Sequence, residues 1–134
     1  MEELSIENLK QALETLEKAF SIYSASDENI DILEMYQDSC IQRFEYTFEC
    51  AWKIMKKYFK LQYNKTEEEL SMNNIFRLME SFEFVPTWLN WKNYNQLRNN
   101  TSHEYNKIKA KKVISILPVF INEVKAIIAR LEQL

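Results

Sequence analysis

One arginine, one histidine and one tyrosine stand close together in the last third of the chain. Arg98 is followed five residues later by His103, the only histidine, and Tyr105 lies two residues beyond that. A guanidinium can hold a phosphate through charge-assisted hydrogen bonds, and an imidazole can exchange a proton near neutral pH. The spacing therefore indicates an anion-binding site with a general acid or base beside it.

These side chains can meet on one ligand only if the helix that carries them is interrupted. In an unbroken helix, residues five apart point about 140° from each other. Residues 99–102 are Asn, Asn, Thr and Ser, which favour caps and turns, and Thr101 with Glu104 fits the capping-box pattern. We therefore expect a second helix with His103 in its first turn, where free backbone N–H groups attract a phosphate.

This cluster suits the cleavage of RNA without a metal ion or cofactor. His103 would take the proton of a ribose 2′-hydroxyl, which then attacks the adjacent phosphorus while Arg98 stabilises the phosphate. The leaving oxygen also needs a proton. One histidine per chain cannot be base and acid at once, so the acid is the His103 of a second copy, Tyr105 or water. The alternative is that Arg98 and His103 only tie two helix ends together.

Helices are predicted on both sides of this cluster. Apolar residues at steps of three and four predict a helix from residue 6 to 23 and a long helix over 30–63. The residues between them, 24–29, are polar and predict a turn. The apolar stripe of the long helix is wider than one face needs, which suggests that a second copy packs on it. Residues 64–70 are expected to form either a solvated connection or the acidic start of a helix.

Local signals place the remaining helices. Ser71 caps a short helix that runs to Phe82, and Pro86 precedes a helix that begins at residue 87 or 88. Tryptophans 88 and 91 at helical spacing are expected in the core rather than stacked on bases. The last apolar pattern, from residue 113 to 134, stays in phase across Pro118, so that helix continues and bends there.

The composition also favours an all-α fold in a single domain, residues 1–134. The chain has no glycine, which excludes P-loops and dinucleotide-binding turns. It shows no secretion signal at its start and no apolar run near the roughly 20 residues that a bilayer requires, so we expect a cytoplasmic protein without a membrane span. Cys40 and Cys50, ten residues apart on one helix, are expected to be unpaired thiols, and no metal site is evident.

The net charge of −3 hides an asymmetry. Residues 1–90 carry 9 basic and 17 acidic side chains, whereas residues 91–134 carry 8 basic and 3 acidic ones. Most of the positive excess lies between Lys92 and Lys112, around the candidate site, and favours an anionic ligand such as RNA. The alternative is a solvated helix face made of Lys107, Lys109, Lys111 and Lys112.

Two motifs resemble one known family. The spacing Arg98-x4-His103 is similar to the motif of HEPN domains, and a longer match resembles the nucleotidyltransferase substrate-binding, HepT-like subgroup: Arg98-Asn99-x-Thr101-Ser102-His103-x-Tyr105. The long helix is similar to a helix of the same subgroup, through Arg43-Phe44-Glu45-Tyr46-Thr47-Phe48-Glu49-x-Ala51-Trp52-Lys53. The resemblance covers most of the chain from Arg43 onward.

The resemblance implies an up-and-down four-helix bundle with an extra short helix, a homodimer, and a minimal nucleotidyltransferase as partner. It implies a toxin of a toxin–antitoxin pair that acts as a metal-independent ribonuclease. Arg98 and His103 would be catalytic, with Asn99 and Ser102 in supporting or substrate-binding positions. Tyr105 would be the residue to which the partner attaches adenylate, which adds negative charge that repels RNA.

Three interpretations remain on the sequence. The first is a ribonuclease controlled by a nucleotidyltransferase. The second is a non-catalytic subunit that binds substrate or nucleotide for that enzyme. The third is a helical interaction module in which Arg98 and His103 are replaceable.

Overall fold

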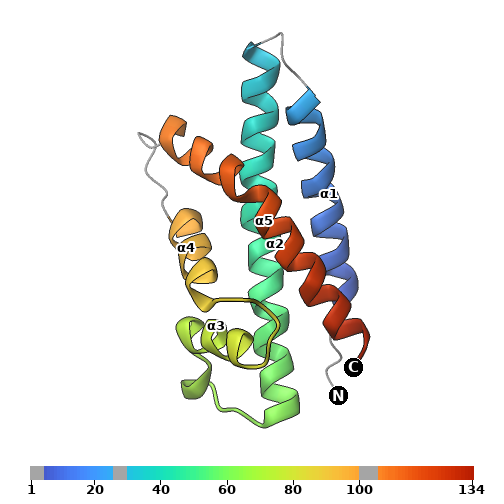
Figure 1. Ribbon diagram of the computed structural model, residues 1–134, viewed down its shortest axis with the longest axis vertical. Coiled ribbons are helices and arrows are strands. Elements are labelled where there is room, and N and C mark those ends of the chain that lie inside the picture. The colour runs from blue at the N-terminus through green and yellow to red at the C-terminus, as the bar shows by residue number, and fades with distance from the viewer. Residues whose placement is uncertain (1–4, 26–29, 100–105) are drawn as a thin grey trace.

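The computed structural model describes residues 5–25, 30–99 and 106–134, and every regular element within them is helical. Helices α1 (Ile6–Ala25) and α2 (Ile30–Tyr63) lie side by side, and α5 (Asn106–Glu132) crosses them (Figure 1). A one-turn 3-10 helix (Glu68–Leu70), α3 (Met72–Ser81) and α4 (Trp88–Asn99) complete the chain. The predicted all-α bundle with an extra short helix is confirmed.

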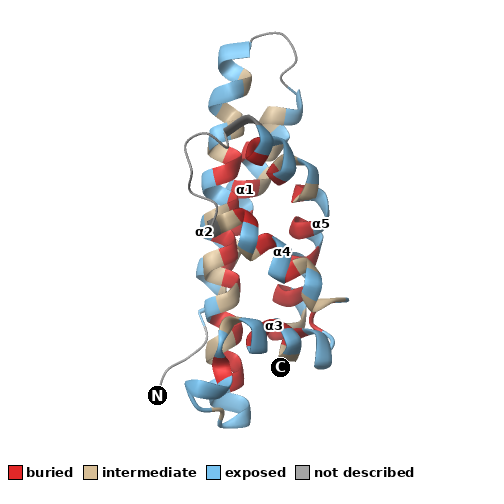
Figure 2. Cartoon of the chain, turned by 90° about the vertical axis from the view of Figure 1, so that its left-hand side faces the viewer, coloured by how far each residue is buried: buried red, intermediate tan, exposed pale blue. Residues whose placement is uncertain are grey.

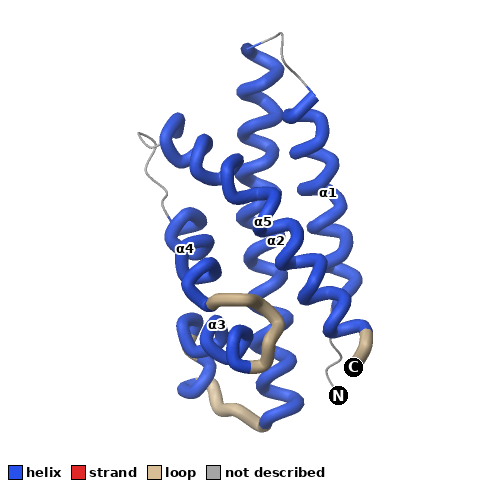
Figure 3. Tube along the Cα trace, in the orientation of Figure 1, coloured by secondary structure: helices blue, strands red, loops and turns tan. Residues whose placement is uncertain are grey.

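Most of the predicted helix boundaries agree with the structure. The long helix spans the predicted 30–63, and Ser71 caps α3 by accepting the backbone N–H of Asn74 on its side-chain oxygen at 3.3 Å. The prediction for the first turn is partly wrong, because Ser24 still belongs to α1. Residues 26–29 lie outside the described part of the chain. Short connections join α2, α3 and α4 (Figure 3).

Helix α5 continues through Pro118, as its apolar pattern predicts. Proline cannot donate a hydrogen bond to the preceding turn, so the helix needs tertiary packing to remain intact there. That packing is present on both sides of the proline, since Val113, Leu117, Phe120 and Val124 are all completely buried. The core therefore holds α5 together across a residue that weakens it.

Two turns adopt a backbone conformation that usually favours glycine, which this chain lacks. Asn64 directly follows α2 with φ of 50°, and asparagine is the usual substitute for glycine after a helix. Glu83, with φ of 64°, follows α3, and this conformation costs about 1 kcal/mol in a residue with a Cβ. Arg130 of α5 offsets that cost, because it donates to the Glu83 carbonyl at 2.9 Å and lies over the Phe84 ring.

The core lies between the helices and is rich in aromatic side chains. Figure 2 shows buried residues along the helix faces that look toward one another. Trp91 of α4 stacks on Phe48 of α2 at 5.6 Å between ring centroids, and Phe120 of α5 packs edge-on against Phe44 at 4.9 Å. These contacts join the three helices that carry the candidate site. The prediction that Trp91 belongs to the core is confirmed.

The wide apolar stripe of α2 is largely used within the chain. Helix α1 packs along α2, and α3, α4 and α5 also contact it. The width of the stripe therefore does not require a second copy of the protein. Apolar side chains that stay exposed on α2 include Ile30, Ile32 and Met35 in its first two turns. None of the described helices is both long and apolar enough to cross a bilayer.

Candidate functional site

Arg98 lies in the last turn of α4 and reaches across to α2. Its Nη1 donates to Glu49 Oε2, forming an ion pair, and its Nη2 donates to Asn95 Oδ1 at 3.4 Å. The guanidinium carbon lies over the Phe48 ring, 5.3 Å from the centroid. Phe48 is completely buried and is stacked on Trp91, so the arginine rests on a rigid part of the core.

The guanidinium is not fully used by these contacts. The side chain of Arg98 keeps 23% of its surface exposed, and its buried Nε has no hydrogen-bond partner in the described part of the chain. Arginine carries five N–H donors, and burying one without a partner is costly. Arg98 therefore combines a fixed position with a partly exposed charge, which suits a group that binds an anion.

Glu49 is held in its charged form by its surroundings. Burial raises its pKa, but hydrogen bonds from Lys53 and Trp52 and the charge of Arg98 together bring the pKa below its ordinary value. The Lys53 ammonium lies 2.9 Å from Glu49 Oε1, and Trp52 Nε1 donates to Oε2 at 3.2 Å. Arg98 thus shares this carboxylate with two other donors, which limits how much of its charge Glu49 neutralises.

A second ion pair lies one helical turn away on α2. Lys109, in the first turn of α5, donates to Glu45 Oε2 at 3.1 Å, and its side chain is only 2% exposed. The interpretation of all four lysines after residue 106 as a solvated face is therefore wrong for Lys109. Lys111 and Lys112 are exposed, and the side chain of Lys107 lies outside the described residues. A buried ammonium needs such a partner, because desolvation penalises an unpaired charge.

The two ion pairs hold the ends of α4 and α5 to the same stretch of α2. Glu45 and Glu49 are four residues apart, so their side chains lie on one face of that helix. Helix α4 is described up to Asn99 and α5 from Asn106, and the predicted interruption after Arg98 lies outside the described residues. The two ion pairs thus hold the end of α4 and the start of α5 to neighbouring turns of α2.

The other predicted site residues fall within that segment. Ser102, His103 and Tyr105, and the proposed cap at Thr101, lie outside the described residues. Asn99 is the last residue of α4, and its side chain is likewise not described. The contact between Arg98 and His103 therefore stays a prediction.

A buried carboxylate fixes the other half of α4. Glu123 of α5 is only 6% exposed and accepts hydrogen bonds from Trp91 Nε1 at 3.0 Å, Asn90 Nδ2 at 3.3 Å and the Tyr94 hydroxyl. Burial, and next the hydrogen bond to Glu123, raise the pKa of Tyr94 far above its ordinary value. The tyrosine therefore stays protonated and donates a hydrogen bond to Glu123. This contact holds the part of α4 that precedes Arg98 against α5.

Sequence reasoning missed the acidic partners at this site. Glu45 and Glu49 stood inside the helix motif but had no assigned role, and Glu123 was not singled out. A signal was present, because Glu123 lies three residues after buried Phe120 and one before buried Val124, on an otherwise apolar face. An acid at a core position of an amphipathic helix predicts buried hydrogen-bond donors opposite it.

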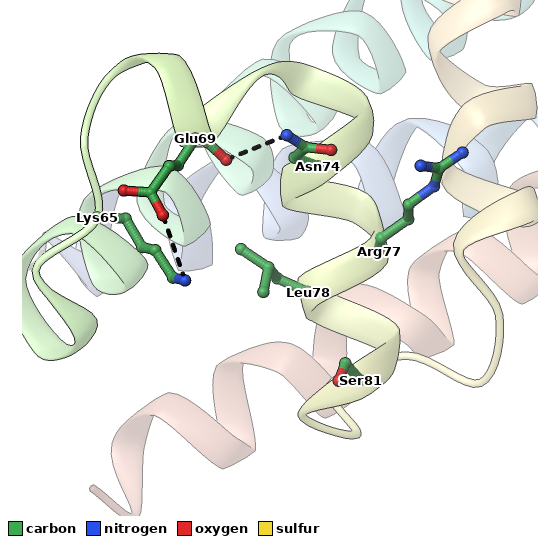
Figure 4. Close-up of a pocket in the computed structure, with 6 residues that line it drawn as sticks. All are labelled: Lys65, Glu69, Asn74, Arg77, Leu78 and Ser81. Atoms are coloured by element: carbon green, nitrogen blue, oxygen red, sulfur yellow. Dashed lines mark hydrogen bonds and ion pairs between the residues drawn. The ribbon is translucent and has the colours of Figure 1, made fainter.

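Other candidate features lie elsewhere. A cavity of about 390 Å³ beside α3 is lined by Lys65, Glu69, Asn74, Arg77, Leu78 and Ser81 (Figure 4). No cluster of three or more His, Cys, Asp or Glu side chains suited to a metal ion occurs within residues 5–25, 30–99 and 106–134. Cys40 and Cys50 are free thiols; Cys40 is buried, which raises its pKa to about 11.

Comparison with known proteins places this arrangement in a family. Residues 4–133 match the model of the family described as nucleotidyltransferase substrate binding protein like. The probable ribonuclease HepT of Haemophilus influenzae is 26% identical over 140 residues, which cover 98% of this chain and 94% of that protein.

Two solved structures have the same fold. A Haemophilus influenzae protein, described as revealing the fold of a substrate binding domain of a nucleotidyltransferase, superposes with a TM-score of 0.84 at 23% identity over 96% of this chain and 99% of that one. A protein from Thermus thermophilus matches with a TM-score of 0.74 at 25% identity over 92% and 98% of the two chains. The interrupted pair α4 and α5 thus belongs to a fold that these proteins share.

Proposed function

Because the chain belongs to the nucleotidyltransferase substrate binding protein-like family, we propose that it is a HEPN-type toxin that cleaves RNA without a metal ion. The observation that carries this proposal is the partly exposed guanidinium of Arg98 at the end of α4, next to the segment that contains the only histidine. The name of the Haemophilus influenzae relative, a probable ribonuclease, supports the same reaction.

Arg98 and His103 divide the chemistry between them. His103 accepts the proton of the 2′-hydroxyl, the 2′ oxygen forms a bond to phosphorus, and the bond to the 5′ oxygen breaks. The products are a 2′,3′-cyclic phosphate and a 5′-hydroxyl. Arg98 binds the non-bridging oxygens, where negative charge grows in the transition state. Asn99 and Ser102 flank these two residues and assist in substrate binding.

A homodimer supplies the acid that one chain lacks. In our proposal the two clusters face each other, and a protonated His103 from the second copy donates to the leaving 5′ oxygen. The family description supports a minimal nucleotidyltransferase as the partner, and we propose that this partner completes a toxin–antitoxin pair. Attachment of adenylate to Tyr105 would place a phosphate near Arg98 and repel RNA.

Purified protein without its partner tests this function. In the presence of EDTA, wild type should cut RNA and leave 2′,3′-cyclic phosphate ends, while His103→Ala should cut at least about 100-fold more slowly because general-base catalysis is lost. Lys18→Gln, an exposed change on α1, serves as the control that keeps full activity. Equal survival of RNA with wild type and His103→Ala would show that catalysis is the wrong claim.

The second candidate is a non-catalytic subunit that binds substrate or nucleotide for a nucleotidyltransferase. The family description and the description of the Haemophilus influenzae structure favour it, because both name substrate binding. It requires the same Arg98 as an anion-binding group. It predicts that wild type binds RNA or nucleotide with Arg98-dependent affinity and leaves the ligand intact.

A further inference from the structure

The indole of Trp88, at the start of α4, lies within reach of two cations. The guanidinium carbon of Arg77 on α3 is 4.6 Å from the ring centroid, and the ammonium of Lys92, one turn further along α4, is 5.5 Å from it. Trp88 is half-buried, whereas Arg77 and Lys92 are exposed. Trp88 packs against the edge of the core, in line with the expectation from the sequence, and its ring also lies beside two cations. We call these three residues the Trp88 cluster.

The cations of the Trp88 cluster are not neutralised by carboxylates. Within the described residues, neither Arg77 nor Lys92 takes part in an ion pair, although several other cationic side chains do. Glu80 is nearby, but its Oε1 accepts the backbone N–H of Trp88 at 2.9 Å and so caps α4. Two like charges gathered at one ring repel each other, and an anion bound between them would remove that repulsion.

The geometry leaves the cations able to bind such an anion. An arginine that lies over an aromatic ring keeps its N–H edge available for a phosphate, and the ring restricts its motion. Figure 4 shows Arg77 extending away from the Lys65–Glu69 ion pair that lines the neighbouring cavity. Arg77 lines the edge of that cavity, and its guanidinium reaches the Trp88 ring of α4.

Two residues of the Trp88 cluster, Trp88 and Lys92, lie on the same helix as Arg98. Trp88 and Arg98 are ten residues apart, which corresponds to about 15 Å along the axis of α4. Asn95 lies on the stripe of Trp88 and Lys92 and contacts Arg98, so polar and basic groups continue from one site to the other. A single strand of RNA has a phosphate at every nucleotide and can span this distance.

We propose that Arg77 and Lys92, held by Trp88, bind one backbone phosphate of the RNA strand whose scissile phosphate is bound by Arg98. This inference rests on the proposed ribonuclease function and assigns that enzyme a second contact with its substrate. Because the cluster reads a phosphate and not a base, it adds affinity without adding sequence preference.

The test measures binding and cleavage in the variant Arg77→Gln/Lys92→Gln. Affinity is followed with a fluorescent single-stranded RNA of about 12 nucleotides, blocked against cleavage by 2′-O-methyl groups, a length within the range that single-strand sites cover. We expect affinity to fall about tenfold. The slope of log affinity against log salt should decrease by about 0.7, the value for one phosphate on a single strand. On cleavable RNA, KM should rise while kcat is unchanged.

The control variant Lys10→Gln/Lys18→Gln removes the same charge from α1, which packs on α2 and α5. It should keep the salt slope of wild type. An unchanged slope in Arg77→Gln/Lys92→Gln, or an equal change in the control, overturns the proposed contact while leaving the ribonuclease in place. If wild type neither binds nor cuts RNA, the proposed function fails and this contact fails with it.

Discussion

Helix α4 is held at its two ends by carboxylates that work in opposite ways. Near its start, Glu123 is almost completely buried and accepts three hydrogen bonds from uncharged donors. At its end, Glu49 keeps 31% of its side-chain surface exposed and pairs with a cation, Arg98. Both contacts join α4 to a longer helix. Only the second involves a charged group that is partly exposed to solvent.

The difference separates a structural role from a chemical one within one helix. A buried carboxylate whose oxygens already accept hydrogen bonds within the protein fixes the position of the helix that donates them. It has no free acceptor for a ligand. A partly exposed ion pair contributes little to stability, because solvent competes for both charges. The charge of Arg98 is therefore available to a phosphate, and the Glu123 end supplies the rigidity that positions it.

The largest effect on stability is expected from Glu123→Ala. This change leaves the buried donors of Trp91 and Tyr94 without a partner, and it should lower the free energy of unfolding by about 3 kcal/mol. Chemical denaturation followed by circular dichroism measures it. The control is Glu132→Ala, which removes an exposed ion pair with Lys10 and should cost less than about 1 kcal/mol. If both variants lose a similar amount of unfolding free energy, Glu123 does not have the structural role that distinguishes the start of α4 from its end.

A smaller effect, on substrate affinity, is expected from Glu49→Gln. The amide oxygen still accepts a hydrogen bond from Arg98, but the negative charge that competes with RNA is gone. We expect KM for RNA to fall about threefold, the scale of a partly exposed ion pair. Glu17→Gln on α1 removes the same charge from an ion pair with Lys125 and should leave KM unchanged. A rise in KM would mean that Glu49 assists RNA binding rather than competing with it.

The smallest effect is a dependence of stability on pH. The pKa of Glu49 in the folded protein is lower than its ordinary value of 4.5. The stability that this carboxylate contributes is therefore fully present above pH 4.5 and is lost as the pH falls through its folded pKa. The difference in unfolding free energy between wild type and Glu49→Gln should narrow in that acid range. Urea titrations at a series of pH values measure this difference. If the unfolding free energies of the two proteins change in parallel with pH, the ion pair between Glu49 and Arg98 does not contribute to stability.

Much of the fold could be predicted from the sequence because helix periodicity and caps are local signals. The spacing of apolar residues defined α2, Ser71 predicted the start of α3, and the in-phase stripe predicted that α5 passes through Pro118. The extension of α1 through Ser24 was missed, because a polar residue at a helix end looks like a turn.

The site was predicted less completely, because its partners come from other helices. Arg98 was singled out from its neighbours in the sequence, whereas its pairing with Glu49 spans 49 positions. Lys109 looked like one lysine of a solvated face, and only the packing of α5 on α2 reveals that its charge is buried. The cations at Trp88 were likewise hidden, since Arg77 belongs to a different helix.

The most direct measurement of the central claim is the cleavage of RNA by Arg98→Gln, made together with its thermal unfolding. If Arg98 holds the reacting phosphate, kcat/KM should fall about 100-fold or more, while the unfolding temperature changes by only a few degrees, as expected for a partly exposed ion pair. The contradictory result is a variant that cleaves RNA as fast as wild type but unfolds at a much lower temperature, which would make Arg98 a structural tie between α2 and α4.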